Sequence, residues 1–201
     1  GLTTALANAG CERRLTARIY MTLFTLMIEV DRLGYNLIEV NHLISFVTSL
    51  EMDMEVVVLP DAQAIAERAA DAIEAVLVAK PNAVLGTATG SSPLPLYDEL
   101  VRRNQAGKLS FKDVTGYMLD EYVGLPVDHY ERYANFMERN LRSRTDMAPG
   151  ALHGPDALNP DPQAACDDYE RALAEAGYAD VQILGIGSDG HIGFNEPGGP
   201  L

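Results

Sequence analysis

The sequence is short of cysteines and of basic side chains, and both shortages limit what the protein can be. Its 201 residues include two cysteines, Cys11 and Cys166, which lie far apart in unrelated contexts. This pattern is typical of reduced cytosolic thiols rather than of a disulfide framework or a metal site. Lys and Arg number 15 against 29 Asp and Glu, so the net charge is −14. No basic cluster is present to bind a phosphate backbone, and we expect no nucleic-acid partner.

Long hydrophobic runs are also missing. The most apolar stretch, residues 19–28, is too short to span a bilayer and is flanked by Arg18, Glu29 and Asp31. The first residues do not resemble a secretory signal with a small-residue cleavage site. We therefore expect a cytoplasmic protein with no membrane partner. Its hydrophobic content of 47% is sufficient for a globular core.

Strand-like and helix-like patterns alternate from residue 54 onward. Four short β-branched or apolar runs predict strands: residues 54–59, 83–86, 114–119 and 181–184. Helical spacing between them predicts helices, one capped by Asp61 and one from about residue 162 to 176 that ends at Gly177. This order predicts an α/β, Rossmann-like, three-layer fold, a mainly parallel sheet with helices on both faces.

Residues 1–53 do not continue this alternation. Residues 19–30 are apolar nearly all round, which predicts a helix. Two interpretations remain open, a buried or interface helix and an extension outside the α/β domain. In the second case the domain covers residues 54–201. The sequence assigns this N-terminal part no function.

Ligands of such sheets bind where the carboxyl ends of the strands meet their loops. The first of these loops, Gly86-Thr-Ala-Thr-Gly-Ser-Ser-Pro93, joins a strand to a helix. Its hydroxyls at Thr89, Ser91 and Ser92 lie beside a helix N-terminus, which favours a phosphate. The loop matches neither G-x-G-x-x-G nor a Walker A motif, so a plain turn is the alternative. Pro95 is expected to restrict the first turn of the following helix.

The second loop, Leu119-Asp-Glu-Tyr-Val-Gly-Leu-Pro126, carries two adjacent carboxylates. In extended backbone, Asp120 and Glu121 point in opposite directions. One can therefore face a ligand while the scaffold holds the other. A capped, solvated turn is the alternative interpretation of this loop.

The third loop is the most specific: Gly185-Ile-Gly-Ser-Asp-Gly-His-Ile-Gly-Phe-Asn-Glu-Pro197. It places three ionisable groups, Asp189, His191 and Glu196, directly after a strand. A carboxylate beside an imidazole fixes its tautomer and raises its basicity, which suits proton transfer near neutral pH. Too few His and carboxylate ligands are present for a metal site, so no metal is expected.

These three loops resemble those of the glucosamine-6-phosphate deaminase family, in the same order and spacing. The segment His129-Tyr-Glu-Arg-Tyr-Ala-Asn-Phe-Met137 is also similar, and the resemblance runs from about residue 54 to the end. It implies a cofactor-free conversion of glucosamine 6-phosphate and water to fructose 6-phosphate and ammonium. A small sugar phosphate is then the partner. The oligomeric state stays open, with a homo-oligomer as one option.

The resemblance also implies roles for single residues. Asp120 is the base that moves a proton from C2 to C1, and Glu121 is scaffold. His191 is the acid and base of ring opening, oriented by Asp189 and Glu196. Residues 89–92, which include Gly90, hold the phosphate. The family continues well past Glu196, so we expect the α/β domain to be incomplete at its C-terminus and the 201-residue chain alone to be inactive or nearly so.

Two other functions share this general fold. A 6-phosphogluconolactonase has a similar Gly-Asp-Gly-His loop, but Phe194-Asn-Glu-Pro197 and the Asp120-Glu-Tyr122 sequence favour the deaminase. A non-catalytic sugar-phosphate sensor has no need of Asp120 and His191 together. Residues 1–53 also lack a convincing DNA-binding helix-turn-helix.

Overall fold

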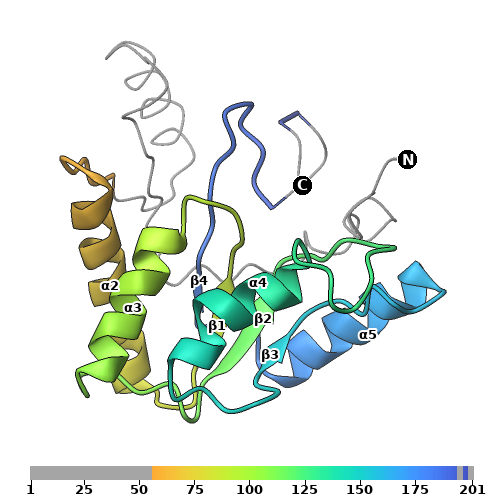
Figure 1. Ribbon diagram of the computed structural model, residues 1–201, viewed down its shortest axis with the longest axis horizontal. Coiled ribbons are helices and arrows are strands. Elements are labelled where there is room, and N and C mark those ends of the chain that lie inside the picture. Colours follow the sequence, from red (N-terminus) through yellow and green to blue (C-terminus); the bar gives the residue numbers. More distant parts are fainter. Residues whose placement is uncertain (1–55, 194–196, 199–201) are drawn as a thin grey trace.

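The computed structural model describes residues 56–193 and 197–198, which form a parallel sheet with helices on both faces (Figure 1). The strand order is β3-β2-β1-β4, and every neighbouring pair is parallel. The strands are β1 (Val84–Thr87), β2 (Thr115–Met118), β3 (Leu152–His153) and β4 (Val181–Gln182). The predicted α/β architecture is confirmed. The predicted helix in residues 1–53 lies outside the described residues.

The helices alternate with these strands along the chain. They are α2 (Ala62–Ala79), α3 (Leu94–Gln105), α4 (Tyr133–Asn140), the short 3-10 helix η3 (Arg142–Arg144) and α5 (Pro162–Glu175). Asp61 caps α2 as predicted, since its Oδ1 accepts the Ala64 N–H at 2.8 Å. α5 also ends as predicted: Gly177 has a φ of 87°, and the Tyr178 N–H returns to the Leu173 carbonyl at 2.9 Å.

Two neighbouring residues of β2 show how the sheet is covered. Successive side chains of a strand point to opposite faces. Met118 joins an apolar cluster with side chains of α2, α3 and α4. Tyr117 faces the other way, and its hydroxyl donates to the Ala172 carbonyl of α5 at 3.1 Å. Within the described residues, α2, α3 and α4 therefore cover one face of the sheet and α5 covers the other.

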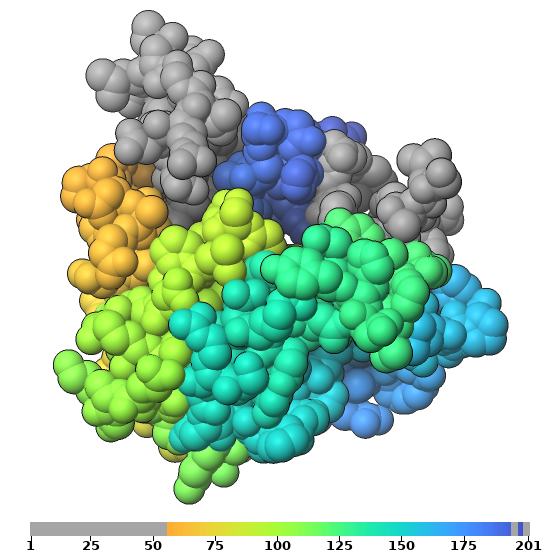
Figure 2. Space-filling view, viewed as in Figure 1, coloured from red at the N-terminus to blue at the C-terminus, as the bar shows by residue number. Residues whose placement is uncertain are grey.

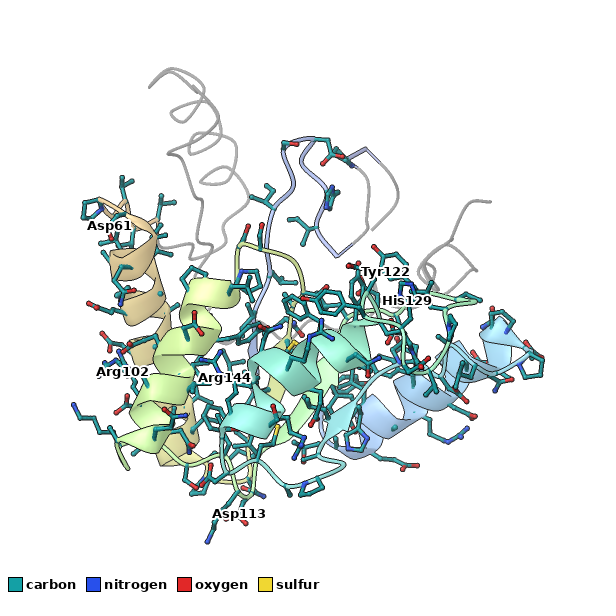
Figure 3. The ribbon with its side chains drawn as sticks, viewed as in Figure 1. Asp61, Arg102, Asp113, Tyr122, His129 and Arg144 are labelled. Atoms are coloured by element: carbon teal, nitrogen blue, oxygen red, sulfur yellow. The ribbon has the colours of Figure 1, made fainter. Side chains whose placement is uncertain are left out.

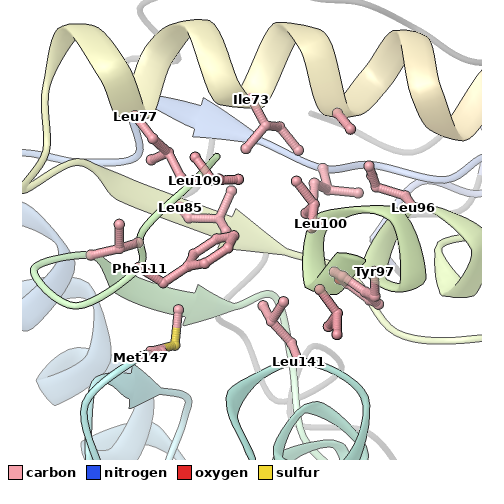
Figure 4. Packing of buried hydrophobic residues seen from close by; sticks show 14 of the residues in the cluster. Ile73, Leu77, Leu85, Leu96, Tyr97, Leu100, Leu109, Phe111, Leu141 and Met147 are labelled. Carbon is pink, nitrogen blue, oxygen red and sulfur yellow. The ribbon is translucent and has the colours of Figure 1, made fainter. Parts of the chain in front are cut away.

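The apolar core lies between the sheet and the first three helices (Figure 4). Its large members that are almost fully buried are Ile73, Leu77, Leu85, Leu96, Tyr97, Leu100, Phe111, Met137, Leu141 and Met147. Burying a side chain of this size stabilises the fold by about 1.5–3 kcal/mol. Because these residues come from α2, α3, α4, β1 and the segments between them, the core fixes the helices against the sheet.

Two elements differ from the expectations. Residues 54–59 were expected to form a strand. Residues 56–59, the described part of this run, form none, and Val58 is 75% exposed. A β-branched run becomes a strand only when a neighbour pairs with it, and residues 56–59 have no such pairing in the described sheet. Conversely, β3 has only two residues and carries too short a pattern to be predicted.

The sheet brings the three loops of interest to one edge. β1 pairs with both β2 and β4, so the segments that follow these three parallel strands leave from the same end. Tyr122, which follows β2, lies at this end, whereas Asp113, which precedes β2, lies at the opposite end (Figure 3). The space-filling view places the segment after β4, in blue, at the surface of the same end (Figure 2).

Candidate active site

A buried tyrosine of α3, Tyr97, fixes the start of the loop after β1. The Tyr97 hydroxyl donates to the Ala88 carbonyl and accepts the Ala88 N–H at 3.1 Å. Two hydrogen bonds to one backbone unit fix where the loop leaves the strand. Beyond this point Thr89 is half-buried, and Ser91 and Ser92 are exposed beside the start of α3. The predicted phosphate-binding residues therefore lie at a helix N-terminus, as expected.

Gly90 lets the backbone of this loop turn at a positive φ. Gly90 has a φ of 100°, a region that side chains with a Cβ rarely adopt. Pro95 was expected to restrict the first turn of the helix. It lies inside that first turn, where a missing N–H costs no helical hydrogen bond, and α3 begins regularly with Tyr97 N–H bonded to the Pro93 carbonyl at 3.0 Å.

Asp120 is a buried carboxyl group at the end of β2. It is 7% exposed. Burial, reinforced by the negative charge of Glu121, raises the pKa of Asp120 to about 6. At pH 7.5 such a carboxylate is largely ionised and is a stronger base than an exposed Asp. This is the environment that acid–base chemistry on a carbon requires.

Glu121 is held by the scaffold. Its side chain is 1% exposed and accepts the backbone N–H groups of Tyr122 and Tyr133 at 2.9 Å and of Ala134 at 3.0 Å. The last two donors belong to the first turn of α4, where a carboxylate is favoured by the helix dipole. Arg132 lies 3.5 Å from the same carboxylate. The expected division between the two adjacent acids is thus confirmed for Glu121.

Asp189 and His191 form a contact pair in the loop after β4. The Nδ1 of His191 lies 2.6 Å from Oδ1 of Asp189. Hydrogen bonds from the backbone and then the ring of His191 lower the pKa of Asp189, so its carboxylate is the acceptor and Nδ1 carries the proton. This tautomer leaves Nε2 as the nitrogen that can exchange a proton with a substrate.

The shape of this loop depends on Gly187. A Cβ at this position would lie 2.3 Å from the imidazole ring and 2.6 Å from the Asp189 carboxylate. The backbone closes around the pair, because the Gly187 N–H donates to the His191 carbonyl at 2.8 Å. Only a glycine lets the backbone approach the imidazole this closely.

Two tyrosines that the sequence interpretation missed pack together beside Asp120. The ring centroids of Tyr122 and Tyr133 are 4.6 Å apart. Burial, the neighbouring Tyr122 side chain and the negative charge of Asp120 raise the pKa of Tyr133. Tyr133 therefore lies close enough to Asp120 to feel its charge. The available signal was a tyrosine at the predicted start of a helix, which by itself indicates no contact.

Residues 56–193 and 197–198 contain no group of three or more His, Cys, Asp or Glu side chains placed to hold a metal ion. The same part of the chain has no helix with the length and apolarity that crossing a membrane requires. Glu196, predicted to orient His191, lies outside the described residues, and its role stays a prediction.

Comparison with known proteins adds to this geometry. Residues 61–193 match the family of glucosamine-6-phosphate isomerases and 6-phosphogluconolactonases. The chain belongs to this family. The matched range includes all three strand-end loops as far as Gly193.

Individual members give a finer picture. The chain is 59% identical to a glucosamine-6-phosphate deaminase of Mycolicibacterium smegmatis over 148 residues, 74% of this chain and 57% of that protein. A solved monomeric glucosamine-6-phosphate deaminase is 38% identical with a TM-score of 0.67, covering 70% of this chain and 58% of the other. A solved 6-phosphogluconolactonase of Thermotoga maritima is 28% identical with a TM-score of 0.58, covering 67% and 60%. The chain thus spans about 57% of the length of the M. smegmatis relative.

Proposed function

We propose that the protein is a glucosamine-6-phosphate deaminase, which converts glucosamine 6-phosphate and water to fructose 6-phosphate and ammonium. The observation that carries this proposal is Asp120, a carboxyl group at the end of β2 that is 7% exposed and whose burial raises its pKa to about 6. A base of this kind beside a phosphate-binding loop suits removal of a proton from a phosphorylated sugar. The 59% identity to a glucosamine-6-phosphate deaminase supports this assignment.

The phosphate anchors the sugar in the loop after β1. Thr89, Gly90, Ser91 and Ser92 supply hydroxyl and backbone N–H donors beside the N-terminus of α3, where an anion is favoured. Binding by the phosphate leaves the opposite end of the sugar, which carries C1 and C2, for the acids of the other two loops.

Ring opening falls to the pair in the loop after β4. His191 takes the proton of the C1 hydroxyl and returns a proton to the ring oxygen as the bond between C1 and that oxygen breaks. Asp189, 2.6 Å from Nδ1, holds the imidazole in the tautomer that leaves Nε2 for this exchange. We assign Glu196 to the same pair, as an acid that orients the ring.

Asp120 carries out the isomerisation. It removes the C2 proton, the electron pair forms a C1–C2 double bond, and the C1 oxygen gains a proton from the substrate's ammonium group, which gives an enolamine. Return of the proton from Asp120 to C1 produces an iminium group at C2. Water adds to this carbon and ammonium leaves. Every step is a proton transfer, an addition or an elimination, so no redox cofactor is required.

The matched chain is shorter than the relatives, and this bears on its activity. The 148 aligned residues make up 57% of the M. smegmatis protein. We propose that the 201-residue chain alone has little or no activity and that the complete protein is the catalyst. We place the reaction in the cytoplasm, where the buried free thiol of Cys166 would stay reduced.

Lactone hydrolysis is the rival, since the family includes 6-phosphogluconolactonases. Hydrolysis of a lactone requires attack of water at C1 and no removal of the C2 proton. The complete protein should therefore be incubated separately with glucosamine 6-phosphate and with 6-phosphogluconolactone, with ammonium release and acid release as the two readouts. Ammonium release supports the deaminase. Acid release without ammonium overturns it in favour of the lactonase.

A further inference from the structure

Tyr97 is a core side chain that carries a polar group. Its ring is 0% exposed and lies in the apolar core (Figure 4). Its hydroxyl donates to the Ala88 carbonyl at 2.5 Å and accepts the Ala88 N–H at 3.1 Å. Ala88 follows the last residue of β1 and is itself 6% exposed. One phenol thus provides partners for both backbone polar groups of a buried residue, directly beyond the end of the strand.

The same tyrosine also holds the other end of the loop after β1. Its backbone N–H donates to the Pro93 carbonyl at 3.0 Å, at the start of α3. The side chain of Tyr97 therefore fixes where the loop begins, and its backbone fixes where the loop ends. Residues 89–92, which we propose as the phosphate ligands, lie between these two attachments.

A loop held at both ends presents its donors in one conformation before the anion arrives. Binding then loses little of the conformational entropy that a free loop would lose. A phenylalanine in place of Tyr97 would fill nearly the same volume but would leave the N–H and the carbonyl of Ala88 buried without these partners. The loop would have to shift to satisfy them, and residues 89–92 would shift with it.

These hydrogen bonds do not depend on pH near neutrality. Burial raises the pKa of Tyr97 above its usual range, so the phenol keeps its proton. Tyr97 is also fully buried, which prevents its hydroxyl from touching a substrate in the loop. Its effect on the reaction is therefore an indirect one, through the backbone of Ala88.

We propose that Tyr97 is a positioning residue of the anion site, which keeps residues 89–92 in the conformation that binds the substrate's phosphate by fixing both ends of their loop. This inference rests on the proposed deaminase function. The phosphate is remote from C1 and C2, so contacts to it stabilise the bound substrate and the transition state alike. Loss of such contacts raises KM and leaves kcat unchanged.

The test is Tyr97→Phe in the complete protein, with kcat and KM measured for glucosamine 6-phosphate and Kd measured for inorganic phosphate. We expect KM and the phosphate Kd to rise together, by roughly three- to tenfold, with kcat changed less than about twofold. The pH dependence of kcat should stay that of the wild type. An unchanged KM and phosphate Kd, or a fall in kcat at constant KM, overturns the proposal.

Tyr117→Phe is the matched control. Tyr117 is 6% exposed, and its hydroxyl donates to the Ala172 carbonyl of α5 at 3.1 Å, on the other face of the sheet. This variant also loses a buried tyrosine hydroxyl, but its hydrogen bond lies away from the loop after β1. Its KM and phosphate Kd should equal those of the wild type. Equal rises in both variants would show a general loosening of the fold and would overturn the proposal.

Hydrogen exchange of the wild type tests the same idea if Tyr97→Phe fails to fold. The Ala88 amide should be protected without ligand as strongly as the amides of β1, and added phosphate should change its protection little. An Ala88 amide that becomes protected only with phosphate contradicts a preformed loop. A complete protein that releases no ammonium, yet binds phosphate more weakly as Tyr97→Phe, refutes the deaminase function alone, which keeps the two failures distinct.

Discussion

The loops after β2 and β4 carry acids in opposite environments. Asp120 and Glu121 are 7% and 1% exposed, and Glu121 alone accepts three backbone N–H groups. The side chains of Asp189 and His191 are 56% and 39% exposed, and the contact that defines them is the one with each other. The loop after β2 is thus built into the fold, whereas the loop after β4 projects from it.

This difference matches what each loop has to do in the proposed reaction. Removing a proton from carbon needs a base whose charge is shielded from water, and burial supplies that at Asp120. Ring opening moves protons between oxygen atoms, which an accessible imidazole can do. Substitutions in the two loops should therefore change the stability of the protein to very different extents.

The largest loss of stability is expected for Glu121→Gln. The change removes the charge that compensates Arg132, which is 8% exposed and whose Nε has no hydrogen-bond partner within the described structure. It also puts an amide group against backbone N–H donors. We expect the free energy of unfolding to fall by about 3 kcal/mol, measured by denaturant titration.

Glu138→Gln is the control for this prediction. Glu138 pairs with Arg142 on the same helical surface, and its side chain is 43% exposed. An exposed pair of this kind contributes less than about 1 kcal/mol. Equal losses in the two variants would show that the buried position of Glu121 has no special weight.

A gain in stability is expected for Asp120→Asn at alkaline pH. Folding raises the pKa of Asp120 from 3.8 to about 6, so the folded state binds this proton more tightly than the unfolded state does. The resulting destabilisation is absent below about pH 4, grows as the pH rises through this window and is complete above about pH 6. Two pKa units correspond to up to about 3 kcal/mol, and we expect about 2 kcal/mol at pH 8.

The readout is the pH dependence of the difference in unfolding free energy between Asp120→Asn and the wild type. The difference should shrink toward pH 4. Asp113→Asn is the matched control, because Asp113 lies at the opposite end of β2 and its side chain is 53% exposed. A pH-independent difference for Asp120→Asn would contradict the raised pKa.

The smallest effect on stability is expected for Asp189→Asn. Its exposed side chain contacts mainly His191, so the midpoint of thermal unfolding should stay at the wild-type value. Activity should still fall, by roughly 10²-fold, because the imidazole loses the carboxylate that fixes its tautomer. A fall in the unfolding midpoint as large as that of Glu121→Gln would remove the distinction between the loops.

Much of the fold followed from local patterns in the sequence. The buried runs that became β1 and β2, the Asp61 cap and the glycine that ends α5 are all determined by nearby residues. The run at residues 56–59 was misleading, because strand formation depends on a pairing partner that the sequence does not display. β3 was missed because two residues carry no periodicity.

The residues of the site could likewise be predicted where local sequence determines them. The expected scaffold role of Glu121 is borne out by its backbone hydrogen bonds, and the glycine spacing after β4 indicated the Asp189–His191 pair. The packing of the Tyr133 ring against Tyr122 was beyond reach, since it depends on how α4 packs against the loop after β2. Tertiary packing of this kind leaves no mark on a single sequence.

The central claim is that Asp120 transfers the C2 proton, and isotope exchange tests it most directly. The complete protein and its Asp120→Asn variant would be incubated with glucosamine 6-phosphate in D₂O, and deuterium at C2 followed by NMR. We predict that the variant still binds the substrate but exchanges at least 10²-fold more slowly. Exchange at the wild-type rate in a folded variant would contradict the assignment of the base.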